Sequence, residues 1–223
     1  MSLLRSARFH TTVAQLRQLP EDGIPELAFV GRSNAGKSSA INALCQRKRL
    51  AFASNTPGRT QALNYFAVGA EPQIDAFLVD MPGYGYAVAD KSSKESWGRL
   101  SGSYLTKRQI LSTVVLVTDI RRGIGPLDVV LLNCLRDDQR LLVLASKADK
   151  LGRQQRTKAV MDINQAIKLL RLQSPFEVRA LSATTGVGLN ECRALIEQWL
   201  RDVAKQTGVL QIAAPKTHAA AAF

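Results

Sequence analysis

Apolar residues follow two patterns along the chain, and the two patterns alternate. Continuous apolar runs bounded by turn residues predict buried strands, and the candidates are residues 27–30, 63–69, 74–80, 113–119, 140–146 and 176–181. Between these runs, apolar residues return at every third or fourth position, which indicates helices that pack by one face. Strands that alternate with helices predict an α/β fold with a mostly parallel sheet covered on both sides. The link between the second and third strands is too short for a crossover, so this pair is expected to be antiparallel.

Three apolar stripes are interpreted as helix faces that pack on the sheet and have no cofactor role. The first comprises Leu127, Val130, Leu131, Cys134 and Leu135. The second comprises Val160, Ile163, Ile167 and Leu170, and the third comprises Leu189, Cys192, Leu195, Ile196, Trp199 and Val203. The cysteines, Cys45, Cys134 and Cys192, lie far apart in such helical patterns. We therefore expect buried free thiols, without a disulfide framework or a metal site.

The length of 223 residues suits one domain with two tails. A polar arm is expected at 1–25, the domain at 26–204, and a disordered tail at 205–223, where an alanine run lacks periodicity. The first residues lack the apolar stretch of a signal peptide, and no apolar run approaches the ~18 residues of a membrane span. We expect a cytoplasmic protein without direct membrane binding, and a monomer.

The charge of the chain is strongly basic. Lys and Arg number 30 against 18 Asp and Glu, which gives a net charge of +12 and a sequence pI near 10.1. Basic surfaces attract polyanions, because Lys and Arg neutralise phosphates and release counterions. Charge alone therefore favours a nucleic-acid partner over a generic basic protein, and it says nothing about the fold.

The segment from Gly31 to Ser38 matches the phosphate-binding pattern G-x-x-x-x-G-K-[ST] at every fixed position. It follows a predicted strand and opens a predicted helix, so backbone N–H groups of the loop and the helix N-terminus should point at phosphates. Lys37 is expected to reach the β- and γ-phosphates, and the Ser38 hydroxyl to bind Mg²⁺. The predicted phosphate contacts are Gly31, Arg32, Ser33, Asn34, Ala35, Gly36, Lys37, Ser38 and Ser39.

A second motif closes the strand 74–80. It reads Asp80, Met81, Pro82, Gly83. A carboxylate at this place can hold Mg²⁺ through a water molecule, and the Gly83 N–H can approach a γ-phosphate. A D-x-P-G turn is weak on its own, but it gains weight because it follows a phosphate loop and an apolar strand.

Two further motifs close the later strands and indicate which base is bound. The first reads Ser146, Lys147, Ala148, Asp149, and the second reads Leu181, Ser182, Ala183. The Asp149 carboxylate can accept hydrogen bonds from the ring N–H and the exocyclic amine of guanine, a donor pair that adenine lacks. The Lys147 stem can lie along the base plane, and the 182–184 turn can donate a backbone N–H to the guanine oxygen. These motifs predict selection of GTP.

The loop before the strand 63–69 is rich in turn residues and contains two threonines. It runs Thr56, Pro57, Gly58, Arg59, Thr60, Gln61 and Ala62, and we expect the nucleotide at 58–62. A threonine there can complete Mg²⁺ coordination and sense the γ-phosphate, so that the loop orders only in the triphosphate state. We assign this role to Thr60, and Thr56 remains the competitor because spacing does not decide between them.

Taken together, the motifs G-R-S-N-A-G-K-S-S, T-P-G-R-T-Q, D-M-P-G-Y-G-Y-A, S-K-A-D and L-S-A resemble a translation-factor-class GTPase. More narrowly, they resemble the EngB (YihA/YsxC) group within the TrmE-Era-EngA-EngB-septin-like superfamily, over about residues 6–204. The resemblance implies a P-loop NTPase fold with three α/β/α layers and one antiparallel strand, the small G domain. It also implies GTP and GDP as ligands, Mg²⁺ at Ser38 and Thr60, and Lys37, Thr60 and Gly83 as catalytic groups.

The resemblance further implies a role in late assembly of the large ribosomal subunit, with ribosomal RNA and proteins as partners, and in cell division and septation. The base-reading motif usually begins with Asn or Thr, and Ser146 keeps the threonine hydroxyl with some loss of rigidity towards the phosphate loop. Two other hypotheses are a P-loop ATPase or small-molecule kinase, which Asp149 disfavours, and a membrane-associated structural GTPase, which the lack of an anchor disfavours.

Two residues bear on turnover. The position after D-x-x-G, where many small GTPases carry a water-orienting glutamine, is Tyr84 here, so hydrolysis is expected to be slow and Tyr84 could simply pack. Asn34 could ligate a K⁺ ion beside the phosphates or merely suit the backbone of the loop.

A basic surface with aromatic residues is the candidate for RNA contact, although its rings could equally be core. Its members are Trp97, Arg99, Leu100, Tyr104, Lys107, Arg108, Arg121, Arg122, Arg47, Lys48, Arg49 and Arg59.

Overall fold

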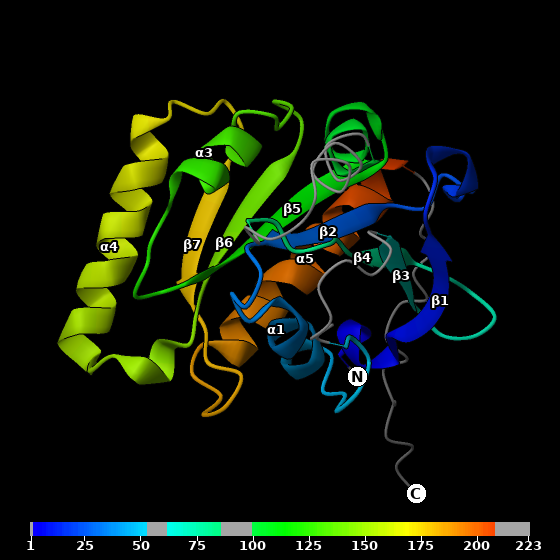
Figure 1. The fold of residues 1–223 in the computed structure, drawn as a ribbon. Helices are drawn as coiled ribbons and strands as arrows, with labels where there is room; N and C mark the ends of the chain where they lie inside the picture. Colours follow the sequence, from blue (N-terminus) through cyan, green and yellow to red (C-terminus); the bar gives the residue numbers. More distant parts are fainter. Residues whose placement is uncertain (1, 53–61, 86–99, 208–223) are drawn as a thin grey trace, which may run out of the picture.

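The computed structural model describes residues 2–52, 62–85 and 100–207. Within these ranges, seven strands form one sheet in the order β1-β3-β4-β2-β5-β6-β7 (Figure 1). The strands are β1 (Arg8–Val13), β2 (Glu26–Gly31), β3 (Leu63–Val68), β4 (Ala76–Asp80), β5 (Leu111–Asp119), β6 (Arg140–Ser146) and β7 (Phe176–Ala180). β2 is parallel to β4 and β5, and β5, β6 and β7 continue the parallel arrangement.

β3 is the one strand that runs against the others. It pairs antiparallel with β4, as expected from the short link between them, and antiparallel with β1 on its other side. The predicted class, a mostly parallel α/β sheet with one antiparallel strand, is therefore confirmed.

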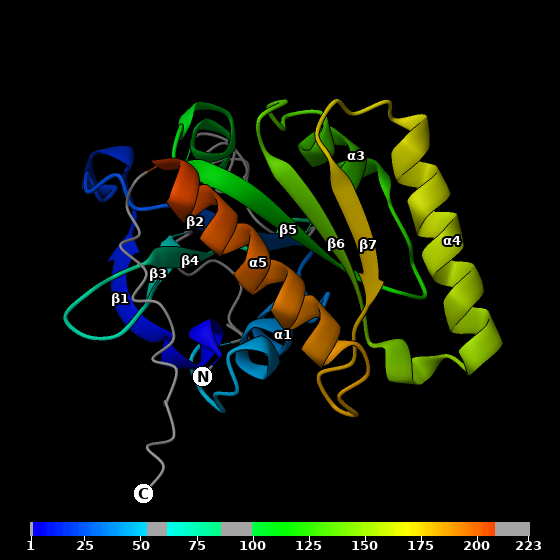
Figure 2. The same cartoon turned by 180° about the vertical axis from the view of Figure 1, so that it is seen from behind.

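Helices cover both faces of the sheet (Figures 1 and 2). The helical elements are α1 (Lys37–Leu44), a segment at 100–107, α3 (Pro126–Leu132), α4 (Arg153–Leu169) and α5 (Leu189–Thr207), with short turns η1 (Leu3–Ser6), η2 (Leu16–Gln18) and η3 (Ala148–Lys150). One core joins α1, α5 and η1 to the sheet, and the other joins 100–107, α3 and α4 to it. Neighbouring β2 residues alternate between the two cores, because successive side chains of a strand point to opposite faces.

Of the segment 1–25, expected to be a polar arm, the described residues 2–25 contribute to the sheet and to its core. β1 adds to the free edge of β3, with Arg8 opposite Ala67 and Val13 opposite Leu63. Leu4 of η1 is fully buried, and its backbone N–H donates to Glu197 Oε1 of α5 at 3.1 Å. This segment therefore packs as part of the domain.

The outcome for the three predicted apolar stripes differs from helix to helix. In α4 and α5, Ile163, Ile167, Cys192 and Ile196 are buried as expected. The first stripe is wrong for three members, because the α3 helix is short and turns Leu131 and Leu132 to the sheet. Leu127 and Val130 are 44% and 63% exposed, and Cys134, beyond the helix, is exposed as well.

The remaining expectations for the chain concern its thiols, its tail and a membrane span. All three cysteines are free, and burial raises the pKa of the Cys45 and Cys192 thiols to about 12. Helix α5 continues to Thr207, so 205–207, assigned to the tail, belong to the last helix, and 208–223 lie outside the described residues. Among the described helices, none has the length and apolar character needed to cross a bilayer.

Candidate nucleotide-binding site

The predicted motifs meet at one edge of the sheet. β2, β4, β5, β6 and β7 are parallel, so their carboxyl ends lie on the same side, and each is followed by a loop that carries polar residues. In open α/β sheets, ligands bind beyond the carboxyl ends of the strands, where such loops converge. The sheet thus brings the phosphate loop, the D-x-P-G turn and the two base-reading turns together.

The phosphate loop joins β2 to α1 in the way that the motif requires. A Cβ at Gly31 would lie 2.5 Å from the Val117 carbonyl oxygen of β5, so only glycine fits at the end of β2. Ala35 N–H donates to the Arg32 oxygen at 3.0 Å, which closes the turn, and α1 begins at Lys37. The first N–H groups of a helix lack partners inside the helix, so the start of α1 offers donors to an anion.

Lys37 and Asp80 form an ion pair at the centre of the site. Both side chains are largely buried, Lys37 at the start of α1 and Asp80 at the end of β4. A buried charge is costly unless it is paired, so each group stabilises the other. The cation predicted for the phosphates and the carboxylate predicted for Mg²⁺ are therefore neighbours.

The turn after β4 is packed tightly against the phosphate loop. A Cβ at Gly83 would lie 3.1 Å from Ser33 Oγ and 3.2 Å from the Ser33 Cα, so a larger residue would have to push the two loops apart. Met81, predicted as a nucleotide contact, has its side chain in the core, and its N–H donates to Phe29 O at 3.1 Å. Met81 is thus placed to support the turn, and Gly83 lies directly against Ser33 of the phosphate loop.

Tyr84 is a packing residue. Its ring is buried, and its hydroxyl donates to Asp128 Oδ1 of α3 at 2.5 Å. Burial, followed by the Asp128 hydrogen bond, raises the pKa of Tyr84 well above its ordinary value. Its backbone also bridges to the phosphate loop, because Ser33 N–H donates to Tyr84 O at 2.9 Å and Tyr84 N–H to Gly31 O at 3.2 Å. The ring therefore holds the turn and α3 together and does not present a water-orienting group.

Ser146 ties the base-reading loop to the phosphate loop. Its hydroxyl donates to Ala35 O at 2.5 Å, so the link expected to be weakened by serine is present. Lys147 adds a second tie, since its Nζ donates to Asn34 O at 2.8 Å and lies 3.2 Å from Asp119 Oδ2. The base-reading and phosphate-binding halves of the site are thus held in a fixed relation.

Asp149 and Ser182 bring the last two motifs together. Ser182 Oγ donates to Asp149 Oδ1 at 2.7 Å, and Lys150 Nζ lies 3.4 Å from the other carboxylate oxygen. The Ser182 hydrogen bond lowers the pKa of Asp149, so this side chain is an anion at neutral pH and can accept the two guanine protons. This geometry agrees with the predicted role of Asp149.

The backbone after β7 narrows the predicted guanine-oxygen donor to one residue. Ser182 N–H donates to Val187 O at 2.9 Å, and the N–H groups of Thr184 and Thr185 donate to Ser182 Oγ. Within the described ranges, Ala183 is the residue of this turn whose N–H has no acceptor. Leu181 and Ala148 are buried, and Ala148 N–H donates a hydrogen bond to Leu181 O at 3.1 Å. These two residues therefore support the two base-reading turns.

Asp119, at the end of β5, is a site residue that the sequence patterns did not single out. Arg121 Nη2 lies 2.6 Å from Asp119 Oδ2, and this hydrogen bond holds the pKa of Asp119 well below its usual range. The same carboxylate faces Lys147 from across the strand end. The sequence could have indicated Asp119 by its position as the last residue of an apolar strand, the same feature that identified Asp80.

Other predicted contacts divide by burial. Ala35 is buried, Arg32, Ser33, Gly36 and Ser38 are half-buried, and Asn34 and Ser39 are exposed. Ala62 is half-buried directly before β3. Gly58, Arg59, Thr60 and Gln61, together with the competitor Thr56, lie outside the described residues.

Part of the predicted basic surface is structural. Tyr104 is fully buried and donates to Glu26 Oε2 at 2.7 Å, and Arg108 pairs with Glu26 Oε1 at 2.6 Å. Leu100 is buried beside them. Tyr104 and Leu100 are core and cannot stack on RNA, and half-buried Arg108 is engaged by Glu26, whereas Trp97 and Arg99 lie outside the described residues. Arg47, Lys48, Arg49 and Arg122 are exposed.

A phosphate loop, a Lys37–Asp80 pair and an ionised base-reading carboxylate at one edge of an α/β sheet define a P-loop GTPase. Residues 26–147 match a family described as 50S ribosome-binding GTPase. The probable GTP-binding protein EngB of Acidovorax ebreus (strain TPSY) is 44% identical over 220 residues, 96% of this chain and 98% of that protein. That of Burkholderia multivorans (strain ATCC 17616 / 249) is 45% identical over 203 residues, 89% and 93% of the two chains. The chain belongs to the EngB family of GTP-binding proteins, which are GTP-hydrolysing enzymes.

Solved structures agree with this fold. The crystal structure of a probable GTP-binding protein engB superposes with a TM-score of 0.60 at 23% identity, over 79% of this chain and 99% of that chain. A structure of Era in complex with MgGDPNP and nucleotides 1506–1542 of 16S ribosomal RNA gives a TM-score of 0.59 at 23% identity, over 79% and 56% of the two chains. At these identities the likeness concerns the fold alone.

Proposed function

We propose that the protein is a GTP-dependent switch that acts as a cytoplasmic monomer in late assembly of the large ribosomal subunit and is needed for normal cell division and septation. The observation that carries this proposal is the match of residues 26–147 to a family described as 50S ribosome-binding GTPase. The net charge of +12 supports an RNA-rich partner, because a basic surface gains affinity for phosphates by releasing counterions.

Mg²⁺ fits the residues at the phosphate end of the site. Ser38 and Asp80 supply a hydroxyl and a carboxylate, the hard oxygen ligands that Mg²⁺ prefers, and Thr60 is the proposed third group. In the described ranges, no three His, Cys, Asp or Glu side chains cluster around a metal position. This donor set suits an ion that binds together with a nucleotide, since Mg²⁺ commonly takes one or two protein ligands plus phosphate oxygens. The ion would neutralise charge on the phosphates.

The protein's own groups support a slow switch. We infer that Lys37 exchanges its contact with Asp80 for the phosphates, and that a γ-phosphate beside Gly83 orders the turn after β4; the Lys37–Asp80 pair and the packing of Gly83 on Ser33 support this. Tyr84 is held by Asp128 and offers no amide to orient water. We therefore infer slow intrinsic turnover, with the surface formed by residues 54–62 and 81–98 changing between GTP and GDP.

Asn34 is the proposed ligand of a K⁺ ion that assists turnover. It is exposed at the tip of the phosphate loop, and its backbone lies in the left-handed region at φ 64°. Asparagine tolerates this conformation well, so the backbone geometry alone would also explain its presence. If its side chain holds K⁺ beside the phosphates, the GTP hydrolysis rate is expected to be higher in potassium than in sodium at equal ionic strength. Asn34→Ala should remove the difference. Identical rates in both salts, at saturating GTP, would leave Asn34 with a backbone role only.

The second candidate function is ATP hydrolysis or phosphorylation of a small molecule. The ionised Asp149 disfavours it, because adenine lacks the pair of N–H donors that this carboxylate could accept. The third, a structural GTPase at the membrane, shares the nucleotide chemistry and differs in the partner. These two alternatives are distinguished by a base-competition assay and by a binding assay with membranes.

Cosedimentation tests the proposed partner. GTP-loaded protein is expected to pellet with purified large ribosomal subunits, and not with vesicles made from bacterial lipid. Binding should weaken steeply as salt is raised, because phosphate contacts release counterions. The salt series is run with Lys158→Ala as a control, since this variant removes one exposed positive charge on α4, where Lys158 pairs with Asp162. Binding to vesicles without binding to subunits would favour the membrane hypothesis.

A further inference from the structure

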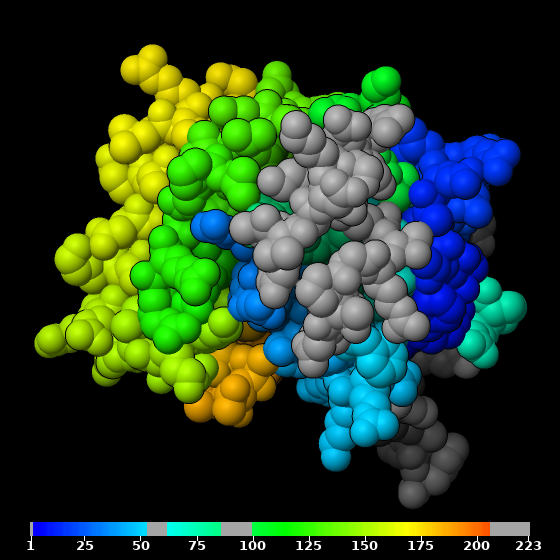
Figure 3. Space-filling model, viewed as in Figure 1, coloured from blue at the N-terminus to red at the C-terminus, as the bar shows by residue number. Residues whose placement is uncertain are grey.

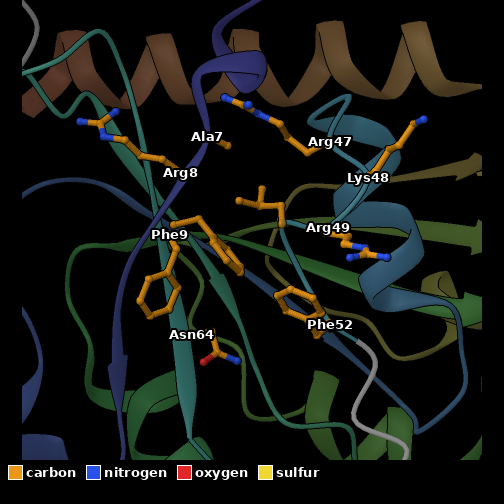
Figure 4. Close-up of a pocket in the computed structure, with 10 residues that line it drawn as sticks. Ala7, Arg8, Phe9, Arg47, Lys48, Arg49, Phe52 and Asn64 are labelled. Carbon is orange, nitrogen blue, oxygen red and sulfur yellow. The ribbon is translucent and has the colours of Figure 1, made fainter.

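A hollow in the protein surface lies away from the nucleotide motifs. It has a volume of about 580 Å³ and lies between β1, β3 and the loop that follows α1 (Figure 4). None of its lining residues belongs to the loops assigned to phosphate or base. Its volume falls within the roughly 300–1,000 Å³ of ligand-binding clefts, so the hollow can admit an unstacked base. We refer to it as the β1 groove.

The β1 groove is lined by four cations and by no carboxylate. These are Arg8 of β1 and Arg47, Lys48 and Arg49 of the loop after α1. Arg8 is engaged, since it donates to Gly69 O at 2.8 Å and lies 3.0 Å from Glu71. The other three are exposed, and in the described ranges no acidic side chain pairs with them. The loop therefore presents three uncompensated positive charges, which suits a polyanion.

Two aromatic rings lie beside these cations. Phe9 is 60% exposed and packs edge-on against Phe66 with ring centroids 6.3 Å apart, and Phe52 is 72% exposed. Figure 4 shows Phe9 on β1 and Phe52 on the loop after α1, on two sides of the same groove. Exposed phenylalanine rings flanked by arginines provide flat apolar faces together with phosphate contacts, the combination used for single-stranded nucleic acid.

The loop that carries the cations is held in place by Asn42 of α1. Its side-chain Nδ2 donates to Ala51 O at 2.8 Å, and its Oδ1 accepts from Leu50 N at 2.9 Å and from Ala51 N at 2.8 Å. Arg193 of α5 fixes the C-terminal end of α1, directly before this loop, by donating to Leu44 O at 2.9 Å. The charges and the Phe52 ring are thus displayed by a pinned loop, which lowers the entropy lost on binding.

We propose that the β1 groove binds a single-stranded segment of RNA, with bases stacked on Phe9 and Phe52 and phosphates bound by Arg47, Lys48 and Arg49. The inference deepens the proposed function and rests on it for the source of the RNA. A duplex hides its base faces and leaves the rings without partners. An acidic peptide uses the cations and also leaves the rings unused.

The test measures RNA affinity of the full chain in GDP by fluorescence anisotropy, with a labelled oligouridylate of about 10 nucleotides. Phe52→Ala and Phe9→Ala are each expected to weaken binding about tenfold, as loss of one stacked base predicts. Phe52→Trp should retain the affinity, because tryptophan restores the stacking face. Replacing Arg47, Lys48 and Arg49 with alanine together should reduce the slope of log affinity against log salt by about 2.

Matched controls come from α4, which lies at the opposite end of the sheet from β1 (Figures 1 and 2). Met161 is 64% exposed and Arg153 is exposed, so Met161→Ala and Arg153→Ala remove comparable apolar surface and charge. Both should leave RNA affinity unchanged. Affinity for a fluorescent GDP analogue, measured on every variant, shows that the domain is folded.

The proposal is overturned if the Phe9→Ala/Phe52→Ala protein, with normal GDP affinity, binds RNA as the unmodified protein does, or if the unmodified protein binds no RNA. It is also overturned if polyglutamate displaces the labelled RNA as well as unlabelled RNA does, and if Phe9→Ala and Phe52→Ala change the affinity for neither polyanion. Cosedimentation with large subunits separates this from the proposed function. If the Phe9 and Phe52 variants keep their RNA affinity and still bind subunits, the groove proposal fails and the proposed function stands. If the unmodified protein binds RNA in the groove but does not bind subunits, the proposed function fails and the groove proposal stands.

Discussion

Lys37→Ala is expected to abolish tight GTP binding. The side chain starts α1, is largely buried and contacts Asp80, so we expect it to be the cation that the phosphate loop offers to the phosphates. Truncating one member of a buried, hydrogen-bonded charge pair costs roughly 2–5 kcal/mol, which corresponds to about 30-fold or more in affinity. The loss should appear as a raised dissociation constant in titrations with a fluorescent GTP analogue.

The matched control is Lys158→Ala, which removes an exposed lysine of α4 and should leave nucleotide affinity unchanged. Removal of Lys37 also leaves Asp80 without its partner, so thermal unfolding of both variants without nucleotide separates a binding defect from unfolding. A folded Lys37→Ala protein with unaltered GTP affinity would show that the P-loop assignment is wrong.

Asp149→Asn is expected to shift base preference from guanine to xanthine. The Asp149 carboxylate, whose pKa the Ser182 hydroxyl lowers further, is expected to accept two protons from guanine, whereas an amide accepts one and donates one. A site built to hydrogen-bond a given group discriminates strongly, because a mismatched partner leaves buried polar atoms unpaired. In competition against a fluorescent nucleotide, XTP should therefore displace better than GTP in the variant.

Asp162→Asn provides the control for this experiment, since it makes the same change on the outer face of α4, where Asp162 pairs with Lys158. It should keep the guanine preference of the unmodified protein. A preference for GTP over XTP in Asp149→Asn would contradict the role assigned to this carboxylate.

The sequence patterns predicted what depends on burial and on fixed spacing. The central parallel strands are apolar throughout because both faces of the sheet are covered, and their carboxyl ends locate Asp80 and Ser146. β1 was missed because it is an edge strand with only Val13 fully buried, so its pattern of exposed and half-buried residues carries little apolar signal. It pairs with β3, 50 to 59 residues further along the chain, counted from Val13–Leu63 (63 minus 13) to Arg8–Ala67 (67 minus 8).

The misassigned surface residues have a similar cause. Tyr104 and Arg108 satisfy a buried carboxylate at Glu26, 78 and 82 positions away, a partnership that no local pattern reveals. In α3, the apolar run Val129 to Leu132 leaves the buried face ambiguous, and the sheet selects Leu131 and Leu132. The β1 groove likewise joins Phe9 to Phe52 from separate segments, so only the folded chain brings them together.

The central claim is that the nucleotide controls binding to the large ribosomal subunit, and the affinity for purified large subunits in the two nucleotide states tests it most directly. The dissociation constant is measured for the full chain loaded with a non-hydrolysable GTP analogue and with GDP, at one fixed salt concentration. The account predicts tighter binding with the analogue, because the γ-phosphate is expected to order residues 54–62 and 81–98, which form part of the surface offered to the subunit. Equal affinity in the two states would contradict it.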